Sequence, residues 1–448
     1  MKKRIYIIQP SYKSMDGKLI KRLPVFNFSN NLPIISATVP GSWEKRICNE
    51  YLDSIDFNDD ASVVILCSTG YDIRHSHEIA KKFRDNGKIV ILGVLMEQIS
   101  KQVMMDVIDS SFTGYPNPMS MNELLEDVLN HRLKTEYNLG MNLDFEFDYS
   151  VFNNQKMWFY PVMAGVGCKY SCSYCCYPQF YQKKYRMRDI EYVINDLKNI
   201  SKKCKIIGFL DANIYNNREY LIKLLQKIID EKLNIQWGVQ ATIDIGDDIE
   251  VLSLLKRAGC KIIFFGIETI DQINMKQLNK HFNINNFPRQ MKNIKEYGIY
   301  VGAFFMFGLD NDTNETFKNI ERFIKKNEID IPYLHLLIPM PGSGIYRQIE
   351  SEGRIHKKYY DEFMNSNPLY SIPCSKLFFE PKKTKDYEIE QQYLKLFGKL
   401  CSWSEIIDRI LTGKLANAFL MLYLNYDARR KFMAMKLNYN KIKELEAG

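Results

Sequence analysis

The stretch from Gly165 to Phe180 reads GVGCKYSCSYCCYPQF and holds four of the ten cysteines of the chain. Three of these, Cys168, Cys172 and Cys175, are spaced C-x3-C-x2-C and follow an apolar run at Val162–Val166. We expect this run to be a strand and the cysteines to lie on the loop after it, where β/α barrels carry their chemistry. Three thiolates from one loop can bind three irons of a [4Fe-4S] cluster and leave the fourth iron without a protein ligand.

A structural zinc site explains these cysteines less well, because such a site usually takes four protein ligands. The sequence has no second C-x2-C pair and no H-x3-H pair to complete one. Cys176 is adjacent to Cys175, so we expect it to point elsewhere and not to be a ligand. The six remaining cysteines are scattered, and we expect them to be small buried hydrophobic residues.

The region around the cysteines, residues 158–354, alternates apolar runs with helical stripes. About six β/α units predict a partial (β/α)6 barrel, which need not be a closed eightfold one. The expected strands are Val162–Val166, Ile206–Leu210, Ile235–Ala241, Ile262–Ile267, Val301–Phe307 and Tyr333–Ile338. Residues 355–448 are predicted to form a mostly helical C-terminal region.

The N-terminal region, residues 1–130, shows a second alternation of strands and helices. The runs Arg4–Gln9, Ser62–Leu66 and Lys88–Leu92 predict buried parallel strands, and Ile73–Asn86 predicts a helix that ends at Gly87. These elements indicate a doubly wound α/β domain, which binds ligands at the carboxyl ends of its strands. Residues 131–157 have no clear period and are predicted to be a linker.

The composition is that of a soluble globular protein, with 46% hydrophobic and 25% charged residues over 448 positions. Wholesale disorder and collagen-like structure are therefore excluded. The net charge of +8 is too small to predict a nucleic-acid partner. No apolar run approaches the ~20 residues of a transmembrane segment, and Ile5–Ile8 is too short for a signal-peptide core. We therefore expect a cytoplasmic protein.

The three-cysteine motif, with Tyr174 directly before its third cysteine, resembles that of the radical S-adenosylmethionine (SAM) enzymes. The resemblance extends over nearly the whole chain to the subgroup with an N-terminal cobalamin (B12)-binding, Rossmann-type domain. It is carried by the segments Tyr185–Arg188 (YRMR), Phe209–Asn213 (FLDAN), Gln240–Asp244 (QATID), Gly266–Glu268 (GIE), Phe307–Asp310 (FGLD) and Pro339–Gly342 (PMPG).

The resemblance implies that the open iron binds the amino and carboxylate groups of SAM. The reduced cluster then cleaves SAM to methionine and a 5'-deoxyadenosyl radical. Polar side chains that follow the apolar runs suit the amine, carboxylate and hydroxyls of such a cofactor. The candidate SAM-binding residues are Tyr174, Asp211, Asn213, Gln240 and Glu268. Asp211 and Asn213 have an alternative role as helix caps, whereas Glu268 is a poor cap.

For the N-terminal domain the resemblance implies a cobalamin site at the strand ends. The candidate contacts are Ser68, Thr69, Gly93, Gly114 and Tyr115. Val94 departs from the subgroup, which usually has a second glycine there, and a Cβ at this position limits the approach of a nucleotide tail. The D-x-H-x-x-G motif is also absent, because the chain reads QPSYK at Gln9–Lys13.

The leading hypothesis is a class B-type methyltransferase, in which the adenosyl radical abstracts hydrogen from an unactivated carbon and methylcobalamin delivers the methyl group. A second hypothesis is a radical SAM enzyme that has lost cobalamin and catalyses cyclisation, rearrangement or epimerisation. A third is a non-catalytic iron-sulfur protein. The resemblance implies an external one-electron donor of the flavodoxin or ferredoxin type, and a small-molecule, lipid or peptide substrate. The sequence identifies no catalytic acid or base.

Overall fold

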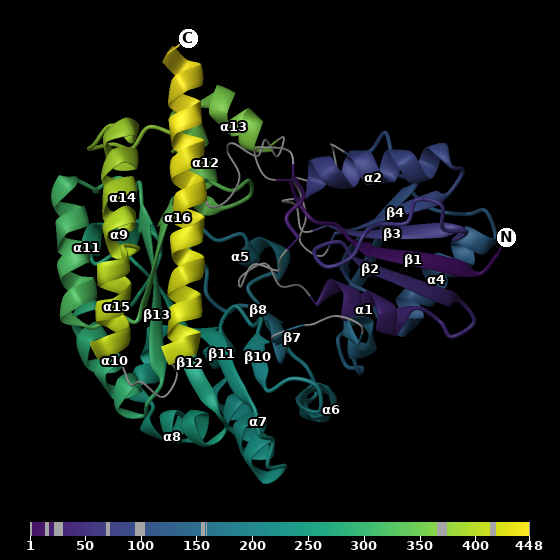
Figure 1. Cartoon of the computed structure of the whole chain (residues 1–448), viewed down its shortest axis with the longest axis horizontal. Coiled ribbons are helices and arrows are strands. Elements are labelled where there is room, and N and C mark those ends of the chain that lie inside the picture. The colour runs from purple at the N-terminus through teal and green to yellow at the C-terminus, as the bar shows by residue number, and fades with distance from the viewer. Residues whose placement is uncertain are drawn as a thin grey trace. The chain divides into compact units, whose positions relative to one another are not determined.

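The computed structural model describes residues 2–13, 18–21, 30–68, 72–94, 104–153, 157, 159–364, 374–412 and 418–447 (Figure 1). The chain divides into two compact units. The first comprises residues 1–163, 188–204 and 363–368, and the second comprises residues 164–187, 205–362 and 369–448. Both units contain parallel strands joined by helices, which confirms the predicted α/β class.

The first unit is built on a parallel sheet with the strand order β2-β1-β3-β4-β5-β6. Its strands are β1 (Arg4–Gln9), β2 (Glu44–Asn49), β3 (Val63–Ser68), β4 (Ile89–Val94), β5 (Ser110–Tyr115) and β6 (Glu136–Met141). Its helices include α1 (Asn31–Thr38), α2 (Ile73–Asp85) and α4 (Pro118–Leu129). Because β1 pairs with both β2 and β3, the strand order reverses at β1. The sheet is therefore doubly wound, as predicted, and has a topological switch point beside β1.

Apolar runs account for the strands that were predicted correctly in this unit. All six residues of β3 are buried, and β1 is buried from Ile5 onward. Phe83 of α2 packs edge to face on Tyr6 of β1, with ring centroids 6.0 Å apart. Helix α2 ends just before Gly87, whose φ of +71° favours glycine.

Three strands of the first sheet were not among the predicted runs: β5, of which only the end at Gly114 and Tyr115 was expected, and the two edge strands β2 and β6. Strand β6 falls inside the expected linker and alternates exposed with buried residues, among them the buried Tyr137 and Leu139. Strand β2 (EKRICN) begins with charged, exposed residues. A strand at the edge of a sheet pairs with a neighbour on one side only and can expose one of its faces to solvent. Only about half of its residues then need to be apolar. Residues 136–141 are therefore part of the sheet, while the boundaries of the four regions remain a proposal.

The second unit contains the strands β10 (Ile206–Phe209), β11 (Gln236–Ala241), β12 (Cys260–Glu268), β13 (Tyr300–Phe307) and β14 (Ile331–Leu336). They are parallel and neighbour one another in this order. The connections between consecutive strands include α7 (Arg218–Asp230), α8 (Ile249–Arg257), α10 (Phe287–Glu296) and α11 (Asn314–Lys326). Five of the six expected barrel strands are thus confirmed.

The first expected barrel strand, Val162–Val166, is corrected by the structure. It is split into β7 (Tyr160–Val162) and β8 (Gly165–Gly167), and β8 pairs antiparallel with β9 (Tyr185–Met187). Gly167 has a φ of +89°, and a Cβ there would lie 2.1 Å from a backbone oxygen just before β9. Glycine at this position lets the chain turn sharply before it enters the cysteine loop, which the apolar pattern alone does not show.

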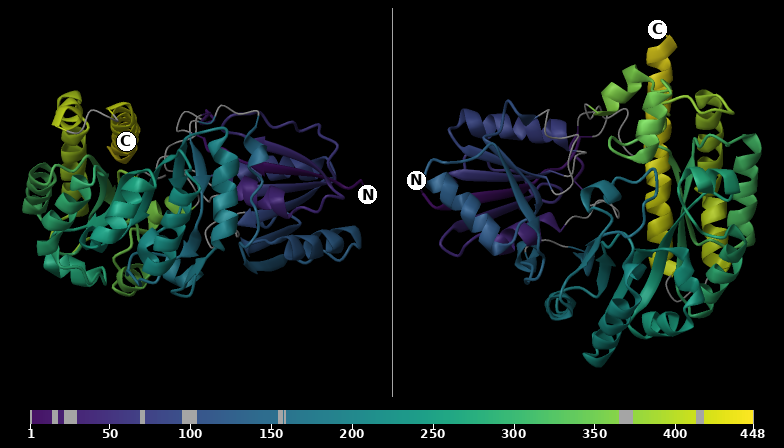
Figure 2. Two further views of the ribbon diagram at one scale, coloured as in Figure 1. Left: turned by 90° about the horizontal axis from the view of Figure 1, so that it is seen from below. Right: turned by 180° about the vertical axis from the view of Figure 1, so that it is seen from behind.

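The C-terminal region is mostly helical, as predicted. It contains α12 (Gly344–Ser351), α13 (Lys357–Met364), α14 (Asp386–Leu400), α15 (Trp403–Thr412) and α16 (Ala418–Ala447). Helices α14, α15 and α16 contact one another, and α14 and α16 also contact β14 (Figures 1 and 2). None of the helices in the described ranges has the length and apolarity needed to cross a bilayer.

Arg188 is a buried charge with several partners in the first unit. Its side chain is fully buried and forms an ion pair with Asp196, with a 2.8 Å distance from Nη1 to Oδ2. The guanidinium also lies over the Phe147 ring, 3.7 Å from its centroid. It donates to the backbone oxygens of Leu143, Phe145 and Met163. Arg188 therefore ties the end of the expected linker to helix α6 (Ile190–Ser201).

We predict that Arg188→Met lowers the free energy of unfolding of the first unit by about 3–5 kcal/mol, because it leaves Asp196 buried without its cation. Urea unfolding of the full chain measures this change. Arg186→Met is the matched control, since Arg186 is exposed, and its effect should stay within about 0.5 kcal/mol. Equal effects of the two substitutions would contradict the assigned role of Arg188.

Candidate active site

The cysteine loop follows β8 and is held in place by backbone contacts to the segment after α9 (Gln272–Gln277). The N–H of Ser173 donates to the oxygen of Leu278 at 3.0 Å, and its hydroxyl donates to the oxygen of Gln277 at 2.7 Å. The Asn279 amide donates to the oxygen of Ser171 at 2.8 Å. The loop is thus anchored on both sides of Cys172 before any metal binds.

The three spaced thiols are partly buried, and burial raises the pKa of each, to about 12 for Cys175. The nearby Lys280 opposes this effect at Cys168 and Cys172. Within the described residues, the three thiols do not form a group with ligand atoms within 4.8 Å of one another. Coordination of an iron by each thiolate would deprotonate the thiols.

Glu268 lies at the end of β12 in a backbone conformation that is rare for residues other than glycine, with a φ of +63°. The pairing of β12 with β13 shifts register between Gly266 and Glu268. A Cβ on Gly266 would lie 2.4 Å from the Glu268 Oε1, so the carboxylate folds back over this glycine. The side chain is almost fully buried, at 6% exposure.

The Glu268 carboxylate connects the cysteine loop to the strand end. Its Oε1 accepts a hydrogen bond from the Tyr174 hydroxyl at 2.8 Å and one from Lys280 Nζ at 3.4 Å. Lys280 also donates to the Gly266 oxygen. In the part of the chain that the structure describes, the second oxygen Oε2 has no hydrogen-bond partner. This arrangement leaves one carboxylate oxygen for the amine or ribose of a cofactor.

Asp211 and Asn213 follow β10 but bind mainly to the protein itself. Burial raises the pKa of Asp211 to about 6, and its two oxygens accept from the Ala164 N–H and the Tyr185 hydroxyl, both at 2.9 Å. The Asn213 oxygen caps a short helical turn and also accepts from the Thr242 N–H at 3.1 Å. These contacts favour the alternative in which both residues position the loops, and their role in SAM binding stays a prediction.

Gln240 differs from these two residues, because its side chain is exposed. It lies on β11 directly beside Phe264 of β12. No hydrogen-bond partner for its amide occurs within the described ranges. Gln240 is therefore accessible, and its role in SAM binding stays a prediction.

The predicted cobalamin contacts lie at strand ends of the first unit. Those that the structure describes are in contact with other residues of the same unit. Ser68 donates to the Asp72 carboxylate. A Cβ on Gly93 would lie 2.6 Å from the Phe112 ring. Gly114 has a φ of +85°, and a Cβ there would lie 2.3 Å from the backbone oxygen of Gly140. Tyr115 is buried at the end of β5. Thr69 lies outside the described residues.

Lys280 is the site residue that sequence reasoning missed. It is 8% exposed, lies 3.4 Å from Glu268, and has its ammonium 5.8 Å from the centroid of the Tyr174 ring. A lysine that is almost fully buried is unusual unless it is paired. No local pattern marks it, because its position depends on the turn after α9. Its positive charge faces both the thiols and the carboxylate.

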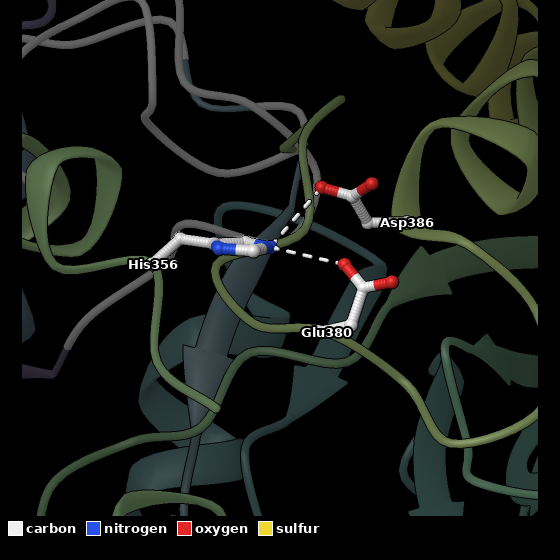
Figure 3. Close-up of side chains that lie close together, drawn as sticks. All are labelled: His356, Glu380 and Asp386. Carbon is white, nitrogen blue, oxygen red and sulfur yellow. Dashed lines mark ion pairs between the residues drawn. The ribbon is translucent and has the colours of Figure 1, made fainter. Parts of the chain in front are cut away.

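A second cluster of titratable groups lies in the C-terminal part of the second unit (Figure 3). The His356 Nε2 is 3.1 Å from an oxygen of Asp386 and 3.6 Å from an oxygen of Glu380. Among the described residues this is the group whose three ligand atoms lie within 4.8 Å of one another. Lys385 already pairs with Glu380 at 2.9 Å. We interpret the cluster as ion pairs that hold these chain segments together.

With the site defined, comparison with known proteins identifies the class. Residues 162–324 match the family model described as Radical SAM superfamily. This range includes the cysteine loop and Glu268. The chain is a radical SAM enzyme.

The relatives of this radical SAM enzyme include two methyltransferases. It is 26% identical to bacteriochlorophyllide d C-12(1)-methyltransferase of Chlorobaculum tepidum, over 79% of this chain and 78% of the relative. It is 25% identical to hopanoid C-2 methylase of Rhodopseudomonas palustris, over 87% of this chain and 80% of the relative.

Two solved structures share its fold. The cobalamin-dependent SAM radical enzyme OxsB with aqua-cobalamin bound has a TM-score of 0.66 at 11% identity, over 100% of this chain and 81% of that chain. The radical SAM methyltransferase TsrM of Kitasatospora setae, with cobalamin and a [4Fe-4S] cluster bound, has a TM-score of 0.63 at 14% identity, over 79% of this chain and 75% of that chain. At these identities the likeness is one of fold, which confirms the predicted architecture.

We predict that alanine at Cys168, Cys172 or Cys175 of this radical SAM enzyme removes more than half of the iron bound after anaerobic reconstitution, because each thiolate binds its own iron. Cys176→Ala is the matched control and should keep the wild-type iron content. Iron analysis and the visible absorbance of the cluster measure the effect. Full cluster loading in Cys172→Ala, or complete loss in Cys176→Ala, would show that the ligands are wrongly assigned.

We predict that Glu268→Gln weakens SAM binding about tenfold and leaves the iron content unchanged. Glutamine keeps an oxygen for Tyr174 but removes the charge that attracts the SAM amine. Isothermal titration with SAM measures the affinity. Glu250→Gln is the control, since Glu250 is exposed on α8 and should bind SAM as the wild type does. An unchanged affinity in Glu268→Gln would remove Glu268 from the SAM site.

Proposed function

We propose that this radical SAM enzyme is a cobalamin-dependent, class B-type methyltransferase that acts on an unactivated carbon. The observation that carries the proposal is the hydrogen bond from Tyr174 to Glu268, which joins the cysteine loop to the strand end of the same unit. The chain also contains a doubly wound sheet of the kind that binds nucleotide-like cofactors at its strand ends.

Different residues of the second unit would bind the cluster and SAM. Cys168, Cys172 and Cys175 would bind three irons of the cluster. Glu268 would hold the amine or a ribose hydroxyl of SAM through its Oε2, while Tyr174 and Lys280 fix its Oε1. When bound, the reduced cluster and SAM supply the 5'-deoxyadenosyl radical, and cobalamin supplies the methyl group. Preorganised donors around Glu268 then need no reorientation when SAM binds.

The first unit offers a site for cobalamin at the carboxyl ends of its strands. Gly93 and Gly114 lie at two of these ends, and because the Phe112 ring and the Gly140 oxygen fill the space that a Cβ would take, a cofactor would contact their backbone from another side. Ser68 ends β3, next to the switch point at β1. We propose these residues, together with Thr69 and Tyr115, as the cobalamin contacts.

Val94 favours a second candidate function. It ends β4, where the resembling subgroup has a glycine, and in general a residue larger than glycine limits how closely a nucleotide tail can approach the backbone. In this second function the enzyme still cleaves SAM, but it binds no cobalamin and catalyses cyclisation, rearrangement or epimerisation.

The proposed function needs a reducing environment and an electron source. A low-potential electron must reach the cluster, so we propose a flavodoxin- or ferredoxin-type donor. Thiolates that bind a cluster must stay reduced, which suits the cytoplasm. The relatives named for bacteriochlorophyllide and hopanoid favour a small molecule with a large ring system as the substrate.

We predict that protein produced with added hydroxocobalamin and purified without oxygen contains close to one cobalt per chain. With SAM and dithionite it should form 5'-deoxyadenosine, and Cys172→Ala should form none. Cobalt analysis and mass spectrometry measure the two results. Deoxyadenosine without cobalt would favour the second candidate function, and protein that yields neither would be a non-catalytic iron-sulfur protein.

A further inference from the structure

Three side chains that are common metal ligands come together in the C-terminal part of the second unit (Figure 3). They belong to His356, which directly precedes α13, to Glu380, and to Asp386, the first residue of α14. We call these three residues the His356 cluster. They come from three different segments of the chain, so a ligand that binds all of them would tie these segments together.

The backbone fixes two members of the His356 cluster side by side. Ile355 and Phe379 form an antiparallel bridge, and His356 and Glu380 each follow one of these bridge partners by one residue. The N–H groups of His356 and Glu380 donate to backbone oxygens across this bridge at 2.8 and 3.0 Å. Because side chains alternate along an extended chain, His356 and Glu380 both point away from the face that carries Ile355 and Phe379.

The distances within the His356 cluster match those between ligands of one metal ion. The His356 Nε2 lies 3.1 Å from the Asp386 Oδ2 and 3.6 Å from the Glu380 Oε2. One ligand atom from each residue lies within 4.8 Å of the other two. Nitrogen and oxygen ligands lie about 2.0–2.2 Å from a tetrahedral zinc ion, so two ligands of one ion are about 3.4 Å apart. The two distances from the imidazole lie on either side of this value.

The direction of the imidazole supports a metal ion more than a hydrogen bond. The His356 Nε2 is buried and has no hydrogen-bond partner among the described residues, although the Asp386 oxygen is only 3.1 Å away. Figure 3 shows the ring pointing between the two carboxylates, so its nitrogen is aimed at neither oxygen. An N–H group prefers to point straight at its acceptor. A nitrogen lone pair in this orientation would instead point at an ion placed between the three groups.

The second oxygen of each carboxylate already has a partner. The Asp386 Oδ1 accepts from the Tyr387 N–H at 2.7 Å, and the Glu380 Oε1 pairs with Lys385 Nζ at 2.9 Å. These contacts leave Oδ2 and Oε2 facing the imidazole, as the outer partners of metal ligands do. Lys385 is exposed, so water and salt screen its charge from a bound cation.

The charge and the chemistry of the three groups fit a divalent metal of the zinc type. Two carboxylates and a neutral imidazole carry a charge of two minus, which balances a divalent ion. Magnesium and calcium prefer oxygen ligands alone, whereas an imidazole together with carboxylates suits zinc. Three protein ligands leave the fourth position of a tetrahedral zinc ion for a water molecule.

We propose that the His356 cluster binds a zinc ion, and that this ion joins the start of α14 to the segment before α13. Zinc would take the place of the proton that the ion pairs of His356 require, because a metal-bound imidazole is neutral. Helix α14 contacts β14, so the ion would fix a helix that packs on the sheet of the second unit. The inference goes beyond the proposed function, since the cluster shares no residue with the cysteine loop or with Glu268.

The test uses the full chain with its [4Fe-4S] cluster reconstituted, so that the cluster thiols are occupied, and zinc chloride as the probe. The protein is dialysed without oxygen against micromolar zinc, and metal analysis measures the zinc bound per chain. We expect the wild type to bind zinc and to unfold at a higher temperature with zinc than without it, because a ligand of the folded state stabilises that state. A millimolar excess of magnesium should displace less than half of the zinc, since magnesium prefers six oxygen ligands.

The variants His356→Gln and Asp386→Asn each remove one ligand and keep a polar side chain. Each should weaken zinc binding about tenfold or more, at least as much as the loss of an outer partner of a metal site. His281→Gln and Asp361→Asn are the matched controls, since both residues are exposed and lie outside the cluster. Iron content shows that each variant has folded, and Glu380→Gln replaces a ligand variant that has lost its iron.

Three results would overturn the inference. The first is a wild type that binds no zinc, and the second is equal zinc content in the wild type and both ligand variants. The third is a His356→Gln variant whose unfolding temperature is lowered by the same amount with and without zinc, because the cluster would then act through ion pairs alone. Cobalt content and deoxyadenosine formation test the proposed function separately, so the failure of either proposal is distinguishable from the failure of the other.

Discussion

The backbone conformation at the end of β12 is the constraint on which the candidate site depends. A glutamate with a φ of +63° carries strain of about 1–3 kcal/mol, which persists only where its surroundings fix it. Here the hydrogen bond from Tyr174 and the contact with Lys280 provide that fixation. In an extended backbone conformation, the Glu268 side chain would point to a different face of the sheet. The left-handed turn instead brings the carboxylate over Gly266 and against a tyrosine 94 residues earlier in the chain.

The sequence predicts the sheet cores well, because buried parallel strands are continuous apolar runs. The assignment of three cluster ligands rests on the spacing of the cysteines on one loop, and it stays a prediction. The sequence misses β6 and β2, whose partly polar sequences are adequate at the edges of a sheet. It also misses the break between β7 and β8, because that break depends on the backbone conformation of Gly167.

The sequence did not predict contacts between residues that are far apart in the chain. Asp211 and Asn213 stand where a cofactor ligand is expected, yet most of their oxygens accept hydrogen bonds from backbone N–H groups or a tyrosine. The same residue types serve as loop anchors and as ligands, so only the geometry separates the roles. Lys280 shows the converse case, because an unremarkable lysine becomes a buried site residue through the turn that precedes it.

The strands of the sheet in the second unit differ in the side chains that they carry. Polar groups follow or end β10, β11 and β12, where Asn213, Gln240 and Glu268 lie. Aromatic rings occupy the same sheet from β12 to β14, and β12 carries both kinds of residue. Gly266 and Gly302 occupy the positions where these two parts meet, and each lacks a Cβ because a neighbouring side chain fills that space. One glycine thus admits a carboxylate and the other an aromatic ring, so the position of the Glu268 carboxylate and the packing of the sheet both depend on residues without a side chain.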